Sequence, residues 1–375
     1  MKLIINKKAS IIRLILSAVF LSSCNTASNT VSTPPKPSPL MVSRIKMFNS
    51  QNGWGILNFG SSWIVVKTSN GGSTWKIVTP PGATTKGGIS GDFINPKNAW
   101  IVFNTFENLH FSSFATTNDS GKNWKPISFS RPLVASAYNI FFQTPTMGWA
   151  LEKSNSGQQL IQIQLNAPQS KIRVNRTIST GSFKASLRGI RFSSSKIGWV
   201  STESKYPELI KTTNSGGSWF LQKLPKAYSY KKSSCVTSLP QFSNTTDAVV
   251  ASSCTAKGIT STQFYTTTNA GSSWIESSRL FAKTSQPVFS SFGTYIWAIG
   301  QAKNKASSNS IIAVSATYGH NWQFYNLPFD ANYTQSINFF NTSIGLVLEK
   351  TNNNTTLWKT KNGGLSWTRA SFNLK

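Results

Sequence analysis

The sequence predicts an all-β protein: a single seven-bladed β-propeller with four antiparallel strands per blade, preceded by a signal peptide and a short disordered tether. Three observations support this prediction. A Phe and Gly-Trp pattern returns at even spacing, a polar turn motif lies between its copies, and 12% of the 375 residues are aromatic while only 13% are charged. So much aromatic surface excludes a chain that is disordered as a whole, because it must be buried.

The first pattern is an apolar segment containing Phe, a polar turn, and a second apolar segment that opens with Gly-Trp, as in IKMFNSQNGWGIL (45–57). Its anchor position recurs at spacings of 46, 49, 50, 50, 48 and 49 residues, through Trp54, Trp100, Trp149, Trp199, Val249, Trp297 and Leu346. Such a period predicts stacked supersecondary units, and four strands per repeat close into a ring. We expect the chain to end on a fourth strand within residues 367–374, with no strand exchanged between its ends.

The second pattern, Ser/Thr-x-Asn/Asp-x-Gly-x-x-Trp, occurs six times, for example as TSNGGSTW (68–75). It resembles the Asp-box, or BNR repeat, of bacterial sialidases and other β-propellers. We expect a tight turn in which Asn or Asp accepts backbone N–H bonds and Gly takes a positive φ. This role is structural, and we expect no metal and no cofactor. The box residues are Asn70, Gly72, Trp75, Asp119, Gly121, Trp124, Asn214, Gly216, Trp219, Asn269, Gly271, Trp274, Gly319, Trp322, Asn362, Gly364 and Trp367.

Two repeats depart from the box pattern. Thr317 stands at the acidic position of the fifth copy, and the third repeat, between Trp149 and Trp199, has no box.

The first forty residues predict export and attachment to a membrane. Basic residues precede an apolar run of about eight residues, 14–21, which is too short to span a bilayer as a helix. The run ends in Leu21-Ser22-Ser23-Cys24, which resembles the lipobox of bacterial lipoproteins. The resemblance implies a signal peptide over residues 1–23, lipidation of Cys24, and a location in the bacterial cell envelope, outside the cytoplasm. Residues 24–40 are rich in Pro, Ser and Thr and are expected to form a tether, and residues 41–375 the propeller.

The two remaining cysteines fit the same register. Cys235 opens the first strand of the fifth blade and Cys254 closes its second, so a hairpin centred between Asn244 and Thr245 places them opposite each other. Outside the cytoplasm this arrangement favours a disulfide, with a pair of reduced buried thiols as the alternative.

An enzyme is disfavoured by the scarcity of chemical groups. The chain has 10 Asp and Glu, two His and three Cys, and no zinc spacing. Sialidases share an Arg-Ile-Pro motif and a cluster of three arginines; the motif is missing here, and nothing in the sequence groups three arginines. A glycoside hydrolase therefore stays an alternative, as does glycan binding without chemistry.

Seven repeats of Phe, Gly-Trp and Thr-x-Asn-x-Gly-x-x-Trp resemble the photosystem II assembly and stability factor family of propellers, which has relatives in non-photosynthetic bacteria. The resemblance covers the whole domain but only its scaffold. It implies a non-enzymatic platform that binds membrane proteins during assembly, and it carries over no binding residue.

The net charge of +28 suggests an anionic partner or environment. Adhesion to anionic envelope polymers or lipid headgroups and life in acid both stay open, whereas no nucleic acid is expected because every Trp has a repeat position. The scarce acids follow second strands, on the face opposite the boxes, so we predict a partner surface of Glu152, Lys153, Glu203, Lys205, Glu349 and Lys350.

Together these observations predict a monomeric, lipid-anchored, non-catalytic platform at a membrane surface. Its predicted partners are the membrane, through the lipid on Cys24, and an envelope protein, with an anionic polymer or a glycan as the alternative.

Overall fold

The structure is a computed structural model of the chain. It describes residues 40–59, 62–81, 89–104, 112–129, 139–154, 157–166, 171–179, 183, 185–225, 234–282, 288–302, 309–351, 354–370 and 372–375. The chain divides into two compact units, Met1–Pro37 and Ser38–Lys375, and everything described below lies in the second.

The described strands form antiparallel runs of four that neighbour one another in chain order. Three runs are separate sheets, each in sequential order. Their strands are β1 (Leu40–Met47), β2 (Gly53–Phe59), β3 (Ser62–Thr68) and β4 (Lys76–Ile77); β22 (Val288–Phe292), β23 (Tyr295–Gln301), β24 (Ser310–Ser315) and β25 (Gln323–Asn326); and β26 (Thr334–Phe339), β27 (Gly345–Thr351), β28 (Asn354–Thr360) and β29 (Thr368–Ala370). A 3-10 turn, η2 (Ala331–Tyr333), precedes the last run.

Two runs join into a sheet of eight strands where β8 and β12 pair in parallel. Its strands are β5 (Ile89–Phe93), β6 (Ala99–Asn104), β7 (Ser112–Thr117), β8 (Lys125–Phe129), β9 (Asn139–Phe142), β10 (Met147–Ser154), β11 (Gly157–Asn166) and β12 (Lys171–Ser179).

A sheet of nine strands holds the next two runs, whose junction is the pairing of β14 with β17. Pro240 lies in the break between β17 and β18, which together take the place of one first strand. The strands are β13 (Ser186–Phe192), β14 (Gly198–Ser204), β15 (Glu208–Thr212), β16 (Phe220–Lys223), β17 (Ser234–Thr237), β18 (Gln241–Phe242), β19 (Ala248–Ala256), β20 (Ile259–Thr267) and β21 (Ile275–Ala282).

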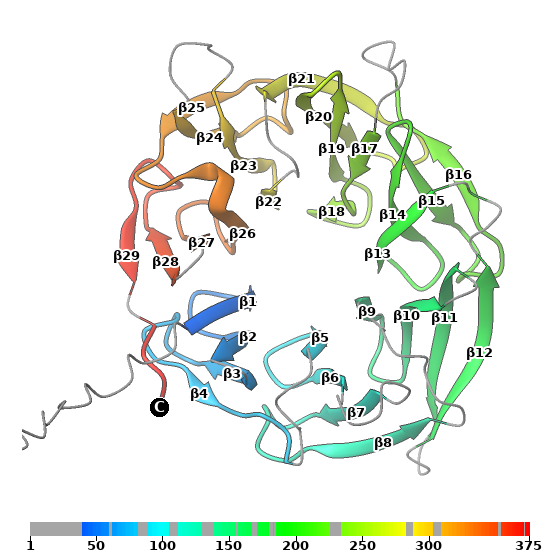
Figure 1. The fold of residues 1–375 in the computed structure, drawn as a ribbon. Coiled ribbons are helices and arrows are strands. Elements are labelled where there is room, and N and C mark those ends of the chain that lie inside the picture. Colours follow the sequence, from blue (N-terminus) through cyan, green and yellow to red (C-terminus); the bar gives the residue numbers. More distant parts are fainter. Residues whose placement is uncertain are drawn as a thin grey trace, which may run out of the picture. The chain divides into compact units, whose positions relative to one another are not determined.

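Within the Ser38–Lys375 unit the runs surround a central opening, with the first strand of each run innermost and the fourth outermost (Figure 1). Each hydrophobic cluster combines residues from two successive runs. One cluster joins the last run to the first, since Leu346 and Leu357 pack with Ile45 and Val66. The core is therefore a series of interfaces between neighbouring runs.

The repeated Trp and Phe meet at these interfaces. Trp54 on β2 stacks on Phe93 of the next run, with ring centroids 5.3 Å apart and planes 8° from parallel. Trp297 on β23 stacks on Phe339 of the following run at 3.8 Å and 2°. Trp100, Trp149 and Trp199 make the equivalent contacts with Phe142, Phe192 and Phe242. The anchor tryptophans are at most 1% exposed. The Phe and Gly-Trp pattern of the sequence thus marks the residues that form the contact between successive runs.

The expectation that no strand is exchanged between the ends is wrong. After β29 the chain continues to the edge of the first sheet, where Leu374 forms a parallel bridge with Trp75. The Trp75 N–H donates to the Asn373 carbonyl at 2.7 Å, and the Lys375 N–H donates to the Trp75 carbonyl at 2.8 Å. Phe372 stacks on the Trp75 indole with centroids 5.0 Å apart. The C-terminal segment therefore ties the last run to the first, because it supplies partners for backbone groups at the edge of the first sheet.

This closure predicts that Phe372→Ala lowers the free energy of unfolding by about 2 kcal/mol, roughly half the cost of deleting a fully buried Phe, since the ring is only half-buried. The measurement is denaturant unfolding followed by near-ultraviolet circular dichroism. Leu365→Ala is the control, because Leu365 is 53% exposed and its loss should change stability by less than about 0.5 kcal/mol. Equal stability of the two variants would contradict the prediction.

Candidate functional site

The box residues form hydrogen-bonded turns between the third and fourth strands. In the first box the Asn70 side-chain oxygen accepts from the Thr68 hydroxyl at 3.0 Å and from the Thr74 N–H at 2.9 Å, while the Gly72 N–H donates to the Thr68 hydroxyl oxygen at 3.0 Å. The same bonds recur around Asp119, Asn214, Asn269 and Asn362. The side-chain oxygen of each is therefore committed to its own turn.

The irregular fifth box keeps this geometry. Thr317 accepts the Asn321 N–H at 2.9 Å through its hydroxyl oxygen, which does the work of the missing carboxylate or amide. A box glycine is required for space as well as for its φ: Gly271 has φ 69°, and a Cβ there would lie 2.9 Å from the Trp199 ring of the preceding run. The boxes thus hold neighbouring runs together.

The predicted Glu and Lys surface is only partly described. Cys24 lies outside the described residues, as do the side chains of Glu152 and Lys153. Glu203 is paired with Arg188 at 2.5 Å within one run, and Lys205 lies over the Tyr206 ring.

Glu349 accepts the Trp358 indole N–H at 2.8 Å and the Asp330 N–H at 3.4 Å, and Lys350 beside it is half-buried. The two described glutamates lie in different sheets, on β14 and β27, and each is engaged inside its own sheet or with the turn beside it. The described part of this surface is therefore a set of separate structural contacts.

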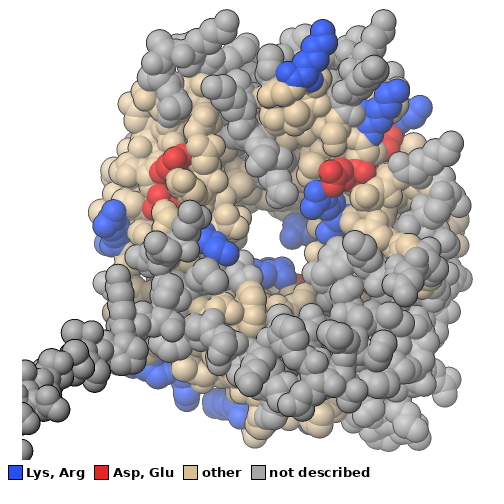
Figure 2. Space-filling model, in the orientation of Figure 1, with Lys and Arg blue, Asp and Glu red and all other residues tan. Residues whose placement is uncertain are grey.

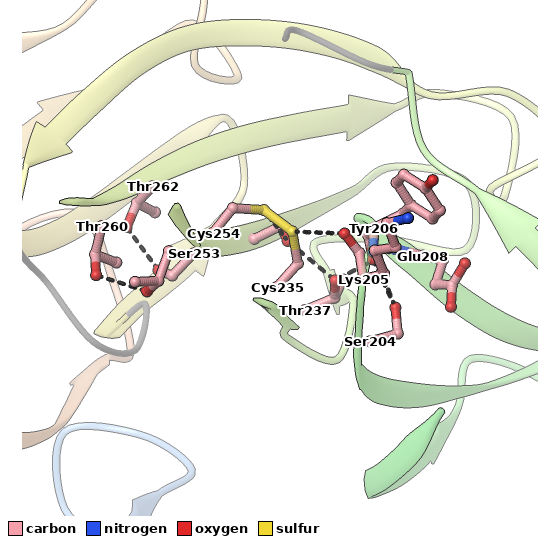
Figure 3. The surroundings of a disulfide bond; sticks show 12 residues. Ser204, Lys205, Tyr206, Glu208, Cys235, Thr237, Ser253, Cys254, Thr260 and Thr262 are labelled. Carbon is pink, nitrogen blue, oxygen red and sulfur yellow. Dashed lines mark hydrogen bonds between the residues drawn. A yellow bond between two sulfur atoms is a disulfide. The ribbon is translucent and has the colours of Figure 1, made fainter. Parts of the chain in front are cut away.

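Cys235 and Cys254 are joined by a disulfide and stand directly opposite each other on β17 and β19 (Figure 3). The Cys235 sulfur lies 3.8 Å from the Lys205 carbonyl oxygen, in the loop after β14. Thr237 and Ser252 share a hydroxyl hydrogen bond of 3.0 Å on the next pair in register. The disulfide thus lies where two successive runs meet.

A further set of residues occupies one register position that we call the belt position: the residue on each first strand directly opposite the anchor. Five of them are polar and hydrogen-bond the backbone of the next run. Lys46 donates to the Phe93 carbonyl at 2.7 Å, and Asp92 accepts the Phe142 N–H at 2.8 Å. Gln241, Ser290 and Asn338 accept from Ser291, Phe339 and Met47.

Two belt residues depart from this pattern. Phe141 stacks on Phe192 of the next run, with centroids 6.2 Å apart. Arg191, opposite Trp199, makes no hydrogen bond to any residue that the structure describes. Its guanidinium is therefore a cation at the belt position that no described hydrogen bond holds.

Arg191 belongs to a central cationic cluster, which we define as Arg44, Lys46 and Arg191 around Asp92. Arg44 donates to the Gly91 carbonyl at 2.5 Å and lies 3.7 Å from the Asp92 carboxylate. Arg44 is the cation paired with Asp92, and the same carboxylate acts electrostatically on Lys46 and Arg191. Figure 2 shows Lys and Arg side chains around the central opening of the described surface.

The electrostatics of this cluster disfavour a third positive charge. Burial is the main influence on the pKa of Lys46, which falls to about 8; Asp92 raises it, and Arg44 and Arg191 lower it further. Burial also lowers the pKa of the Arg191 guanidinium, again with Asp92 opposing and Arg44 adding to the effect. An anion placed beside these groups would relieve their mutual repulsion.

Most carboxylates of the described residues are already engaged. Six serve as acceptors or ion-pair partners within the fold: Asp92, Asp119, Asp247, Asp330, Glu203 and Glu349. Glu208 is buried on β15, and Glu276 lies on the outer strand β21. Within the described ranges, no three His, Cys, Asp or Glu side chains are grouped closely enough to hold a metal ion.

The central cationic cluster was not predicted from the sequence, although a signal for it exists. Lys46, Asp92 and Arg191 each directly precede the Met or Phe that ends the first strand of a repeat. An alignment of the repeats on that residue brings them to one position.

No family model matches the chain, and no curated protein matches it in sequence. Among solved structures it is similar to the GH74 xyloglucanase from Xanthomonas campestris, with 12% identity, a TM-score of 0.54, and coverage of 88% of this chain and 53% of that one. It is also similar to a PL25 ulvan lyase, with 8% identity, a TM-score of 0.56, and coverage of 87% and 93%. YCF48 bound to D1 peptide gives 16% identity and a TM-score of 0.44, with coverage of 77% and 82%.

The chain spans about half the length of the xyloglucanase. At these identities the likeness shows the fold alone, which is that of a β-propeller. No helix among the described residues has the length and apolar character needed to cross a membrane.

The cluster predicts that one lysine, Lys46, titrates near pH 8, measurable from lysine side-chain chemical shifts between pH 6 and 11 and assigned with Lys46→Gln. Asp92→Asn should lower this pKa further, because it removes the only charge that raises it. Since the folded pKa lies below the ordinary value of 10.5, the unfolded chain binds more protons between about pH 8 and 10.5. The contribution of Lys46 to stability therefore rises with pH across that window and is lost as the pH falls through about 8. A rise in this pKa in Asp92→Asn would contradict the assignment.

Proposed function

We propose that this chain is a non-catalytic binding platform at a membrane surface, built as a single seven-bladed β-propeller whose central cationic cluster holds an acidic segment of an envelope protein. The observation that carries the proposal is Arg191, a cation at the belt position that no described hydrogen bond employs. The seven blades are supported by the runs β1–β4, β5–β8, β9–β12, β13–β16, β17–β21, β22–β25 and β26–β29. The contacts between the last run and the first support their closure into one ring.

The cluster suits recognition of carboxylates. Arg44 and Arg191 carry planar guanidinium groups that pair with carboxylates in two parallel hydrogen bonds. Lys46 and Arg44 are held in place by backbone carbonyls, so little side-chain freedom is lost when a ligand binds. A group of three cations, two of them held in place, with one carboxylate among them therefore favours an acidic partner.

The commitment of the carboxylates favours binding over glycoside hydrolysis. A hydrolase needs one carboxylic acid and one carboxylate on opposite sides of the scissile bond, about 5–10 Å apart. Six of the described carboxylates are held by hydrogen bonds or an ion pair inside the scaffold, so they are poorly placed for proton transfer to a substrate. This supports a non-catalytic role and leaves glycan hydrolysis as the weaker alternative.

The attachment proposed for this platform is a lipid on Cys24, followed by the tether of residues 24–40. Two acyl chains on one cysteine anchor a protein stably, whereas a single chain binds only reversibly. A basic propeller on a short tether would stay close to anionic headgroups, whose attraction falls off within about 10 Å.

The experiment is affinity capture from solubilised envelope extract on the immobilised protein, washed at low and then at high salt, with mass spectrometry of what remains. We expect one defined protein to be retained at high salt and to be reduced about tenfold by Arg191→Gln, the cost of one charge-assisted hydrogen bond. Lys196→Gln is the matched control, because Lys196 is exposed in the turn between β13 and β14 and should leave retention unchanged.

Two outcomes would overturn the proposal. One is loss of all protein at high salt with only anionic polymer bound at low salt, which favours electrostatic adhesion. The other is equal loss in Arg191→Gln and Lys196→Gln, which removes the central cationic cluster from the interaction.

The anchor is tested separately by metabolic labelling with a palmitate analogue. We expect label on the wild-type chain and none on Cys24→Ser, which should leave the membrane fraction on washing because the acyl chains supply the attachment. Cys254→Ser is the control, since its partner lies in the folded propeller and not at the anchor. Membrane retention of unlabelled Cys24→Ser would contradict the lipid anchor.

A further inference from the structure

A second repeated position points to a ligand site away from the central cationic cluster. Three third strands carry Lys directly before the first residue of a box, opposite the anchor: Lys67, Lys211 and Lys359. Lys211 reaches across to the next run and donates to the Gly271 carbonyl at 2.8 Å, and Lys359 donates to the Gly71 carbonyl at 3.4 Å. In both cases the ammonium group is used to hold the box of the following run.

Lys67 is the exception. Its ammonium makes no hydrogen bond to a described residue and lies 5.7 Å from the centroid of the Trp54 ring. It lines a cleft of about 420 Å³ between the first and second runs, together with Lys76 and Lys122. The pKa of Lys67 is lowered by burial and then by the charge of Lys122, so the cations of this cleft repel each other.

The rest of the cleft has one apolar and one polar side. Ile77, which is 47% exposed, lines it with Val78, Pro81 and Trp124. The polar side holds the Ser69 hydroxyl and the backbone of the second box at Gly121. The hydroxyls of Thr68, Thr79 and Ser120 also line it, and each already forms a hydrogen bond within the fold. No carboxylate is among the described residues that line the cleft, and its volume lies in the range of small-ligand pockets.

The equivalent place between the last and first runs is occupied. There the pocket is about 240 Å³, Lys359 is bonded to the Gly71 carbonyl, and the Asn373 amide of the C-terminal segment donates to the Ser73 carbonyl at 3.3 Å. The Lys67 cleft therefore has three cations where the equivalent pocket has one, a greater volume, and an ammonium group without a hydrogen bond to a described residue.

We propose that the Lys67 cleft binds a sugar ring that carries a phosphate, sulfate or carboxylate group. The anionic group pairs with Lys67 and Lys122, the hydroxyls of the ring bond the hydroxyl side of the cleft, and its C–H face packs on Ile77 and Trp124. This site shares no residue with the central cationic cluster, so the proposal can be tested independently of the function proposed above.

The test is isothermal titration calorimetry on the purified full-length chain with glucose 6-phosphate, glucose 6-sulfate, glucuronate, glucose and inorganic phosphate as probes. We expect at least one anionic sugar to bind at least about tenfold more tightly than both glucose and inorganic phosphate, and the three anionic sugars to identify which anion the cleft prefers. Lys67→Gln with Lys122→Gln should weaken that binding about tenfold or more, because each removes a charge-assisted bond.

Lys359→Gln is the matched control, since it changes the same repeat position at a place where the ammonium group is already used, and it should leave binding unchanged. Lys67→Arg keeps the positive charge and should therefore retain more of the affinity than the double Gln variant. Equal melting temperatures of the wild type and the variants exclude loss of the fold. Equal binding by wild type and the double variant, equal binding of inorganic phosphate and the anionic sugars, or no binding of any anionic sugar would overturn the proposal.

Discussion

The stacking of an anchor tryptophan on the phenylalanine of the next run is the contact on which the propeller depends. A single run of four strands leaves this indole uncovered, so each run is stable only beside its successor. Two anchors are not Trp, and each lies in a run with an additional constraint. Val249 is in the run closed by the Cys235–Cys254 disulfide, and Leu346 is at the junction that the C-terminal segment closes onto Trp75. The weaker contacts therefore coincide with covalent or backbone reinforcement.

The scaffold can be predicted from the sequence where the contacting residues lie close together along the chain. A box is a set of hydrogen bonds among residues within eight positions, so its residue types and spacing reveal it directly. The anchor spacing is equally clear, since the large indole of Trp must be buried at five of the seven anchors. The belt position is not, because Lys46, Asp92, Gln241, Ser290 and Asn338 do the same work with different chemistry. A backbone N–H or carbonyl is satisfied by any matching acceptor or donor, and no consensus residue results.

The predicted Glu and Lys surface shows a second limit of the sequence. From the sequence, a charged residue after a strand is expected to face solvent. In the structure, Glu349 accepts a hydrogen bond from the Trp358 indole N–H, and Glu203 accepts one from the Arg188 guanidinium. Which polar group is free depends on partners on neighbouring strands, fixed only by register. The closing segment was missed for the same reason: Phe372 has a partner nearly 300 residues earlier, and no local pattern announces it.

The low number of carboxylates limits the partners that the cations can have within the fold. Most described acids are consumed by the scaffold, so positive charge has few internal partners and must be held by backbone carbonyls, as at Lys46 and Lys211. In a repeat protein each position has a default partner in the next unit. Arg191 and Lys67 are the cations at two such positions whose described surroundings do not supply it. At the same repeat positions elsewhere in the chain, the polar side chain bonds the next run. A cation that lacks this bond is stronger grounds for function than a charged residue on an ordinary loop, because the repeat offers a structural partner that this cation does not use.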